Sequence, residues 1–441
     1  MTNRARKKYV MRGATPAVPN TGLTLRQYYL MVGLGAFVTT IAQPGVIGRL
    51  PLRILLKDDL HLTAQGLATF MFVSTFAWNV KPLAGLLSDA FPLFGTRRRH
   101  YMIAGAGLAA LSWFALGIIP HRYGWFLVVA IAANAFMVMA STVMGGLMVE
   151  AGQQYSVSGR ITSIRQAVQS AVSLGNGILG GYLATVAFGW TAGIATGLLL
   201  TLAVATVFVL REPPHAAWSR EVLHHAVAQL RTLVQSWTLW AAGLFLALVY
   251  ITPGFTTPLL YRQTSVLGFS TPYIGLMETI EGATGLAGAA VYAIVCRRLT
   301  LRRLLFVTIS TNALGTLLYL VYGYQTAPVI HGVSGLVGIW SELSLMDLAV
   351  RATPRGCESL GFSLMMSARN FALGGSDVFG AWLLDSRGWS FPELVWLNAG
   401  TTALVLLFVP LLPRAIVDHR DRDAPAQALA PPAEPSRAPV T

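Results

Sequence analysis

The sequence predicts an all-α membrane protein in which twelve transmembrane helices form two pseudo-symmetric bundles of six. Three observations lead to this fold class: the composition, the spacing of apolar segments and the placement of basic residues. Of the 441 residues, 54% are hydrophobic and only 11% are charged, whereas soluble domains contain about 25% charged residues. A soluble protein needs those charges to cover its surface, so lipid is the expected solvent.

Twelve segments are long and apolar enough to cross a bilayer. Its hydrocarbon core is about 30 Å thick and requires roughly 20 apolar residues per helix, because lipid cannot satisfy an exposed backbone. The first six segments are 28–52, 64–88, 101–119, 124–150, 162–187 and 190–210. The other six are 237–261, 272–296, 303–324, 329–351, 359–384 and 392–413. We therefore expect an N-terminal bundle over 26–211 and a C-terminal bundle over 236–413.

Three polar segments flank and join these bundles. Residues 1–25 are basic and polar and show no removable signal peptide, so we expect a cytoplasmic N-terminal segment. Between the bundles, the linker 212–235 contains apolar residues interspersed with histidine and arginine, which predicts an amphipathic surface helix. The tail 414–441 is rich in Pro, Ala and charge and is expected to be disordered.

The basic residues predict the orientation in the membrane. With the N-terminus inside, 26 of the 32 Lys and Arg fall on the cytoplasmic side and 6 on the other, namely Arg49, Arg53, Lys57, Arg122, Arg262 and Arg387. Cytoplasmic loops carry such an excess, so both termini are expected in the cytoplasm of a multi-pass protein of the inner or plasma membrane. The net charge of +14 does not indicate a nucleic-acid partner, since the bases lie in short clusters between apolar runs.

The first and seventh predicted helices share an interruption. Pro44-Gly45 breaks the first and Pro253-Gly254 the seventh, and Pro51-Leu52 matches Pro258-Leu259 at an offset of 207 residues. So sparse a match is also compatible with coincidence. Interrupted helices at corresponding places nevertheless indicate a substrate path between two halves.

The loop after the second predicted helix carries the most specific motif. It contains Gly85, Asp89 and the basic triplet 97–99, and it resembles the gating loop of the major facilitator superfamily. The triplet consists of Arg97, Arg98 and Arg99. We expect Asp89 and these arginines to form a cytoplasmic latch; helix capping and membrane topology are the alternative explanation.

The longer string 78–101 is similar to the signature of the folate-biopterin transporter family, a branch of that superfamily. The similarity recurs in 252–258, 354–370 and 377–398. It implies two six-helix bundles around a midplane cavity and the uptake of folates, pterins or similar compounds by alternating access, while some relatives are linked to S-adenosylmethionine. One departure is that Ser141 and Gly145 stand where we would expect acidic residues, shortly before Glu150.

Charges inside the membrane are expensive, so each requires a partner, a wet cavity or a function. Arg369 lies about ten residues into its helix, near the midplane. We predict that Arg369 and Asn370 bind substrate; an interhelical salt bridge is the alternative for the arginine. Lys81 could likewise meet substrate or extend to the interface.

Three glutamates are candidates for proton coupling. Glu278 and Glu281 are three residues apart on one helix face, and Glu342 lies on the tenth predicted helix. A carboxylic acid in a low dielectric can load and release a proton near neutral pH. The alternative for the first two is that one simply neutralises Arg369 or Arg262.

Neutral groups complete the predicted path. We expect Gln43, Tyr250 and Thr252 to hydrogen-bond a planar heterocycle. The aromatic residues expected to stack on it are Trp78, Trp113 and Phe255.

These residues predict a secondary active transporter for a small polar, anionic solute, without covalent chemistry, cofactor or metal, acting as a monomer. No Walker-type phosphate loop occurs, so we expect the electrochemical gradient, with H⁺ as the coupling ion, to supply the energy. One rival is a transporter of the same fold for S-adenosylmethionine, a sugar, an organic acid or a drug. Another is a membrane assembly factor that transports nothing. An enzyme is the weakest alternative, since no HExxH or GxSxG motif is present.

Overall fold

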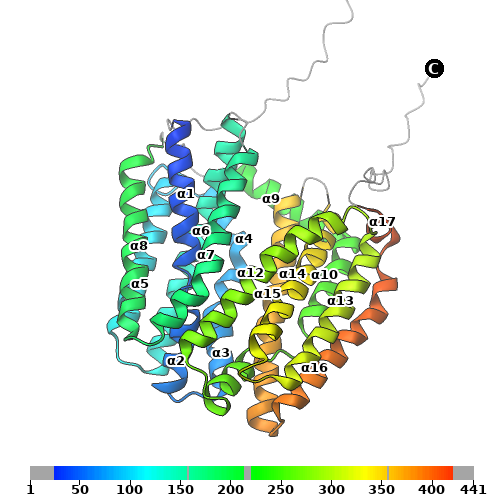
Figure 1. The fold of residues 1–441 in the computed structure, drawn as a ribbon. Helices are drawn as coiled ribbons and strands as arrows, with labels where there is room; N and C mark the ends of the chain where they lie inside the picture. The colour runs from blue at the N-terminus through cyan, green and yellow to red at the C-terminus, as the bar shows by residue number, and fades with distance from the viewer. Residues whose placement is uncertain (1–23, 156–157, 213–219, 355–356, 421–441) are drawn as a thin grey trace, which may run out of the picture.

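The computed structural model describes residues 24–155, 158–212, 220–354 and 357–420, which are almost entirely helical (Figure 1). The N-terminal half contains α1 (Leu25–Ile41), α2 (Arg49–Asp58), α3 (Ala64–Ser74), η1 (Phe76–Val80), α4 (Lys81–Ala90), α5 (Arg99–Ile118), α6 (Tyr123–Tyr155), α7 (Ser158–Leu183) and α8 (Phe188–Val209). The segment between the halves contains α9 (Arg220–Gln235).

The C-terminal half contains α10 (Trp237–Tyr250), α11 (Thr256–Tyr261), η2 (Arg262–Val266), α12 (Thr271–Val295), α13 (Leu301–Leu317), η3 (Leu318–Val321), α14 (Ala327–Ala352), α15 (Glu358–Arg387), α16 (Phe391–Val405), η4 (Leu406–Leu411) and α17 (Arg414–Val417). Each predicted span coincides with one helix or one interrupted helix. The predicted all-α membrane architecture is therefore confirmed.

Order at the C-terminus extends further than the composition suggested. The segment expected to be disordered begins with α17, whose Ile416 and Val417 are buried in the core of the C-terminal half. Their apolar side chains explain why this turn packs on the bundle. The remainder of the predicted tail, 421–441, and the N-terminal segment 1–23 lie outside the described residues.

Each half has its own core. One buried cluster runs from Tyr28 to Leu210 and a second from Leu233 to Val417. In Figure 1, α1, α5 and α8 lie in one group and α13 and α16 in the other, with α7 and α12 between them. Two cores of this kind allow the halves to move against each other as units.

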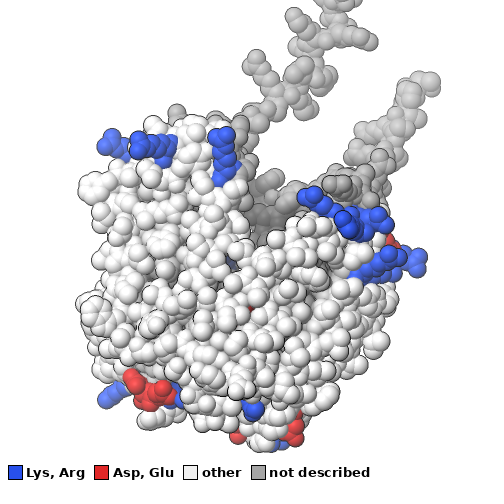
Figure 2. Space-filling model, in the orientation of Figure 1, with Lys and Arg blue, Asp and Glu red and all other residues white. Residues whose placement is uncertain are grey.

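Charged side chains lie at both ends of the molecule, and the basic ones gather mainly at one of them. Figure 2 shows Lys and Arg gathered at the end where α1 begins and α17 lies, while the broad middle is almost free of charge on this face. We call the end where α1 begins and α17 lies the basic end. Large apolar side chains are exposed on the long helices, among them Trp125, Phe208 and Leu244, which are 66%, 74% and 65% exposed. Such a surface suits lipid rather than water.

Among the described residues, seven helices are individually long and apolar enough to cross a membrane. The predicted spans outside this set are either broken or carry charge. Breaks interrupt the first and seventh spans, whereas α7, α12 and α15 contain Arg165, Glu278 and Arg369. The spans that depart from an apolar composition thus carry polar groups into the interior, as does α14, which passes the test but contains His331 and Glu342.

The two halves contact each other at the end opposite the basic end. There the backbone N–H of Gln65 donates to Asp385 Oδ2 at 2.6 Å, and the Tyr261 hydroxyl donates to the Leu62 carbonyl. Nearby, α7 and α12 pack so closely that a Cβ on Gly177 or Gly275 would overlap the other helix backbone. Small residues of this kind allow close helix contact in membranes. These contacts close the interface at this end.

Candidate functional site

The break in the first span is held by side chains of neighbouring helices. Between α1 and α2 the chain leaves the helix at Pro44-Gly45, which frees backbone carbonyls that lipid cannot satisfy. The Trp113 indole N–H donates to the Ala42 carbonyl at 2.8 Å, and Asn176 Nδ2 donates to the Val46 carbonyl at 3.1 Å. Trp113 is fully buried, so the prediction that it stacks on substrate is wrong.

The break between α10 and α11 is held differently, by α15 and α16. Asn398 Nδ2 donates to the Pro253 carbonyl at 2.8 Å. Asp377 accepts hydrogen bonds from the backbone N–H and the hydroxyl of Thr257, at 2.9 and 2.6 Å, and so caps α11. A Cβ on Gly380 would overlap the Gly254 carbonyl oxygen. The C-terminal break is thus fixed rigidly to α15.

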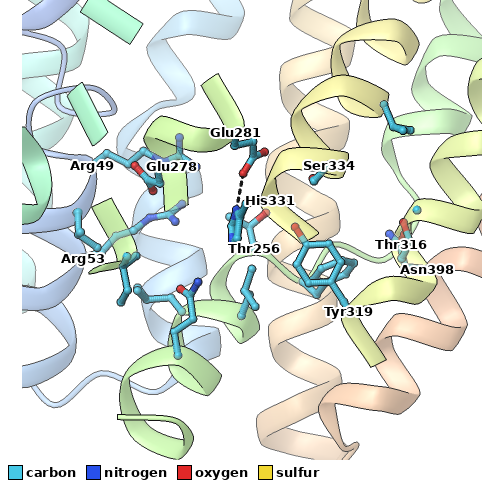
Figure 3. Close-up of a pocket in the computed structure, with 18 of the residues that line it drawn as sticks. Arg49, Arg53, Thr256, Glu278, Glu281, Thr316, Tyr319, His331, Ser334 and Asn398 are labelled. Atoms are coloured by element: carbon cyan, nitrogen blue, oxygen red, sulfur yellow. Dashed lines mark hydrogen bonds and ion pairs between the residues drawn. The ribbon is translucent and has the colours of Figure 1, made fainter. Parts of the chain in front are cut away.

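A central cavity of about 280 Å³ opens beside both breaks (Figure 3). Its polar lining comes from both halves: α2 contributes arginines, α12 glutamates, and α14 a histidine and a serine. The labelled residues in Figure 3 are Arg49, Arg53, Thr256, Glu278, Glu281, Thr316, Tyr319, His331, Ser334 and Asn398. A polar chamber between the halves of a membrane protein is the place where a solute can bind without meeting lipid.

One salt bridge crosses this cavity from half to half. Arg49 Nε lies 3.4 Å from Glu278 Oε1, with 44% and 20% of the two side chains exposed. Arg53, one helical turn later, lines the same cavity. Its Nε atom is buried and has no hydrogen-bond partner among the described residues. A cation without a matched acceptor here favours binding of an anionic group.

A chain of hydrogen bonds runs along the C-terminal wall of the cavity. Glu281 Oε2 lies 2.9 Å from His331 Nδ1, and His331 Nε2 lies 2.9 Å from the Tyr322 hydroxyl. Gln263 Nε2 donates to that hydroxyl at 2.7 Å. The histidine side chain is 6% exposed, whereas that of Glu281 is 43% exposed. Gln263 and His331 also border the cavity, but Glu281 is by far the most exposed member of the chain.

A second cavity, of about 120 Å³, lies within the N-terminal half. Lys81 Nζ donates to Ser141 Oγ at 3.2 Å and lies 5.4 Å from the centre of the Trp78 ring. Arg165 and Gln43 also line this cavity, and none of its described lining residues is Asp or Glu. The chamber has cations and an aromatic face but no carboxylate to neutralise them.

A third cluster joins α10, α14 and α15. Glu342 accepts hydrogen bonds from the Tyr250 hydroxyl and from Arg369, whose Nη2 lies 2.8 Å from Glu342 Oε2. Arg369 Nη1 donates to Asn370 Oδ1 at 3.1 Å. The Thr252 hydroxyl, in contrast, donates to the Val249 carbonyl of its own helix turn. Arg369 thus has the interhelical partner that the alternative interpretation required, while its guanidinium stays partly accessible at 24%.

The glutamates of α12 have partners other than those considered from the sequence. Glu278 pairs with Arg49 and Glu281 with His331, whereas Arg369 is paired with Glu342. The idea that Glu278 or Glu281 neutralises Arg369 or Arg262 is therefore wrong. The guanidinium of Arg262 instead lies 5.0 Å from the centre of the Phe391 ring.

The loop with the basic triplet is anchored by a residue far along the chain. Glu212 accepts hydrogen bonds from the backbone N–H groups of Arg97, Arg98 and Arg99 at 2.9–3.0 Å. The Arg98 guanidinium donates to Ser88 Oγ and fills the space where a Cβ on Gly146 would stand. Gly85 faces Thr142 of α6. The Asp89 side chain lies outside the described part of the structure.

Comparison with known proteins identifies the family. The model of the BT1 family matches residues 45–428, which is most of the chain and includes the break at Pro253-Gly254 and the whole lining of the central cavity. The chain belongs to the BT1 family. A folate-biopterin transporter of Synechocystis is 26% identical over 424 residues, covering 88% of this chain and 85% of that protein. Folate transporter 1 of Plasmodium falciparum is 22% identical over 389 residues, covering 83% and 76%.

Solved structures agree on the fold. A nucleoside transporter, NupG, aligns with a TM-score of 0.69 at 12% identity, covering 87% of this chain and 99% of its own. A D-xylose-proton symporter aligns with a TM-score of 0.62 at 14% identity, covering 87% and 96%. The major facilitator fold is thus confirmed. The chain is a multi-pass membrane transporter and not an enzyme.

Three residues of the central cavity escaped the sequence analysis. Arg49 and Arg53 were assigned to the outer side of the membrane, although their spacing of four residues places them on one helix face. His331 received no role because a single histidine in an apolar helix carries little signal. A membrane-embedded histidine 50 residues from Glu281 could have prompted a search for a partner, but the sequence does not show which carboxylate it meets.

Proposed function

We propose that this protein is a secondary active transporter that moves a small anionic solute of the folate or pterin class across the inner or plasma membrane by alternating access, coupled to protons. The observation that carries the proposal is the central cavity, where the buried Arg53 Nε has no hydrogen-bond partner among the described residues, beside the Arg49–Glu278 salt bridge. Its volume of about 280 Å³ lies near the lower end of the range for small-molecule sites, about 300–1,000 Å³.

The anionic part of the solute is assigned to Arg53 and Arg49. Arginine presents its donors in a planar fork that matches a carboxylate or phosphate. An incoming carboxylate can bind Arg53 and compete with Glu278 for Arg49. Because Arg49 and Glu278 belong to different halves, this competition changes a contact on which the relative position of the halves depends.

The planar heterocycle is assigned to the cavity of the N-terminal half. Trp78 offers a ring face, Lys81 a cation and Gln43 an amide, and all three line this chamber. Gln43 directly precedes the break that separates α1 from the arginines of α2. In our proposal the α1–α2 break thus connects the two solute-binding chambers. Tyr250, Thr252, Arg369 and Asn370 are proposed to contact solute from the C-terminal half.

Proton coupling is assigned to the carboxylates of the C-terminal half. Glu281 and Glu278 line the central cavity, and Glu342 holds Arg369. Protonation of any of them would weaken its contact with Arg49, His331 or Arg369 and so couple the proton to solute binding or to movement of the halves. Glu281 is the foremost candidate because its side chain is the most exposed of the three.

The gate is assigned to the basic end, which we propose to face the cytoplasm. The contacts at the opposite end, including Gln65 with Asp385, are those of an inward-facing state. In the outward-facing state, Gly85, Asp89 and the triplet 97–99 would close the basic end.

Uptake into proteoliposomes tests this function. Purified protein is reconstituted, and radiolabelled folic acid, biopterin, S-adenosylmethionine and glucose are compared with and without an inward proton gradient. We expect saturable uptake of folic acid or biopterin that the gradient accelerates and a protonophore abolishes. Saturable uptake of another solute alone would refute the substrate class, and the absence of flux for every solute would favour an assembly factor.

A further inference from the structure

The hydrogen-bond chain on the wall of the central cavity has a direction. It consists of Gln263, Tyr322, His331 and Glu281, with successive distances of 2.7, 2.9 and 2.9 Å. An amide nitrogen only donates, so the Tyr322 oxygen accepts from Gln263. The single hydroxyl proton of Tyr322 is then available for His331 Nε2.

This direction fixes the tautomer of the histidine. If Nε2 accepts from Tyr322, it carries no proton, and in a neutral imidazole the proton must then be on Nδ1. Nδ1 lies 2.9 Å from Glu281 Oε2, so its N–H points at the carboxylate. If the proton were on Nε2, the lone pair of Nδ1 would instead face a lone pair of Glu281 Oε2, which is unfavourable.

The hydrogen bonds around the buried histidine suit its neutral form. Gln263, Tyr322 and His331 are each 3–4% exposed. A charged imidazole there would lose its hydration and would need a second acceptor beside Nε2, where Tyr322 already donates. The Glu281 side chain is 43% exposed, so a proton from cavity water can reach it directly.

The surroundings of the pair are mixed in charge. Tyr319 of η3 packs its ring edge-on against His331, with 6.2 Å between ring centres, and Ser334 lies one turn further along α14. Across the cavity, α2 presents Arg49 and Arg53, and Glu278 lies on the same helix as Glu281. Protonation of Glu281 therefore changes the balance between two arginines and two carboxylates in one chamber.

We propose that Gln263 and Tyr322 are positioning residues that hold His331 as the Nδ1–H tautomer, and that Glu281, held by this N–H, is the group that binds the coupled proton. The proposal rests on the proton coupling assigned above and adds nearly fully buried residues that set the proton affinity of Glu281. In the step itself, a proton from cavity water bonds to a carboxylate oxygen of Glu281, and no other covalent bond changes. The charge of the Glu281 side chain then changes from −1 to zero.

Infrared difference spectroscopy on the purified protein tests the inference without any solute. The C=O stretch of a protonated carboxyl group is followed against pH, and the part that disappears in Glu281→Gln reports Glu281. In Tyr322→Phe, the Nδ1–H donor is no longer polarised, and once Glu281 is protonated the imidazole can change to the other tautomer. Both effects favour the protonated carboxyl, so we expect its midpoint to rise by about one pH unit, the equivalent of one ordinary hydrogen bond.

Tyr319→Phe is the matched control. Tyr319 stacks on Tyr322 and is similarly buried, but its hydroxyl is outside the chain. We expect its midpoint to equal that of the unchanged protein. An equal or lower midpoint in Tyr322→Phe would overturn the proposal, as would a spectrum in which no signal dependent on Glu281 titrates.

Two substitutions of the histidine give an independent check. His331→Asn keeps an N–H near the position of Nδ1, whereas His331→Gln places its amide near Nε2. We expect the asparagine variant to stay near the original midpoint and the glutamine variant to titrate at higher pH. Equal midpoints in the two variants would contradict the role of the Nδ1–H group.

This readout separates the inference from the proposed function. If the midpoint shifts as expected but no proton gradient accelerates uptake, the proton site exists and the assigned coupling is wrong. If uptake follows the gradient but the midpoint does not respond to Tyr322→Phe, the coupling holds and the positioning role is wrong.

Discussion

The two cavities differ in how their charges are balanced. In the N-terminal half, Lys81 and Arg165 line a chamber that contains no carboxylate among its described lining residues. In the C-terminal half, the central glutamates each have a partner: Glu278 pairs with Arg49, Glu281 with His331 and Glu342 with Arg369. An uncompensated positive chamber suits an anion, whereas carboxylates with partners suit proton exchange.

This difference indicates a division of labour between the halves. The N-terminal half and the arginines of α2 would hold the solute, and the C-terminal half would carry the proton. The Arg49–Glu278 salt bridge connects the two because it joins α2 to α12. The variants below test this division, from the largest expected effect to the smallest.

Glu281→Gln should abolish accumulation of folic acid driven by a proton gradient. The amide cannot take up a proton, so the gradient has no group on which to act, whereas exchange of labelled for unlabelled folic acid needs no net proton movement and should persist. Both are measured in proteoliposomes. Glu393→Gln is the control, since this carboxylate caps the start of α16 outside the cavity. Gradient-driven accumulation in Glu281→Gln would show that the proton is carried elsewhere.

Arg369→Gln should destabilise the protein because it leaves Glu342 without its cation. Breaking a buried ion pair typically costs about 3–5 kcal/mol, and removing the second charge restores much of this. We therefore expect a lower melting temperature for Arg369→Gln and partial recovery when Glu342→Gln is added. Folic acid affinity should stay low in the double variant. If folic acid affinity recovered together with stability in the double variant, the role of Arg369 would be purely structural.

Arg53→Gln should weaken folic acid binding by roughly tenfold to a hundredfold, because a hydrogen bond to a charged group contributes about 1.5–3 kcal/mol. Stability should change little, since the Arg53 Nε has no protein partner to lose among the described residues. Isothermal titration measures the affinity. Arg387→Gln is the control, because that guanidinium lies over the Trp382 ring at the end of α15. Equal affinity in both variants would remove Arg53 from the solute site.

Gly380→Ala should lower stability by about 1–3 kcal/mol, the usual cost of overpacking. Its new methyl group would overlap the Gly254 carbonyl and push the α10–α11 break away from α15. Gly375→Ala is the matched control, since a Cβ there meets no atom within 4 Å. Thermal unfolding of both variants compares them. Equal melting temperatures would mean that the break is not fixed to α15.

The sequence predicted the spans and the breaks because their signals are local. The length of an apolar run and the Pro44-Gly45 and Pro253-Gly254 pairs need no knowledge of neighbours. Asn176 and Asn398, which satisfy the freed carbonyls, could not be assigned, because hydrogen-bond partners more than a hundred residues away are set by helix packing.

The charges of the site were found only in part for the same reason. Depth along a helix marked Glu281 and Arg369 as candidates, but depth does not tell which face of the helix a side chain occupies. The sequence assigned Arg53 only to the outer side of the membrane. It does not show that the break turns α2 towards the cavity, because that turn depends on tertiary contacts. A role for His331 can be recognised only from its contact with Glu281, which lies 50 residues earlier and on another helix.

Counting the protons that accompany solute binding tests the account most directly. Isothermal titration of folic acid in buffers of different ionisation enthalpy gives the number of protons taken up per molecule bound. The account predicts uptake of about one proton by the unchanged protein and none by Glu281→Gln, which should still bind folic acid. Proton uptake that persists in Glu281→Gln, or binding without any proton uptake in the unchanged protein, would contradict it.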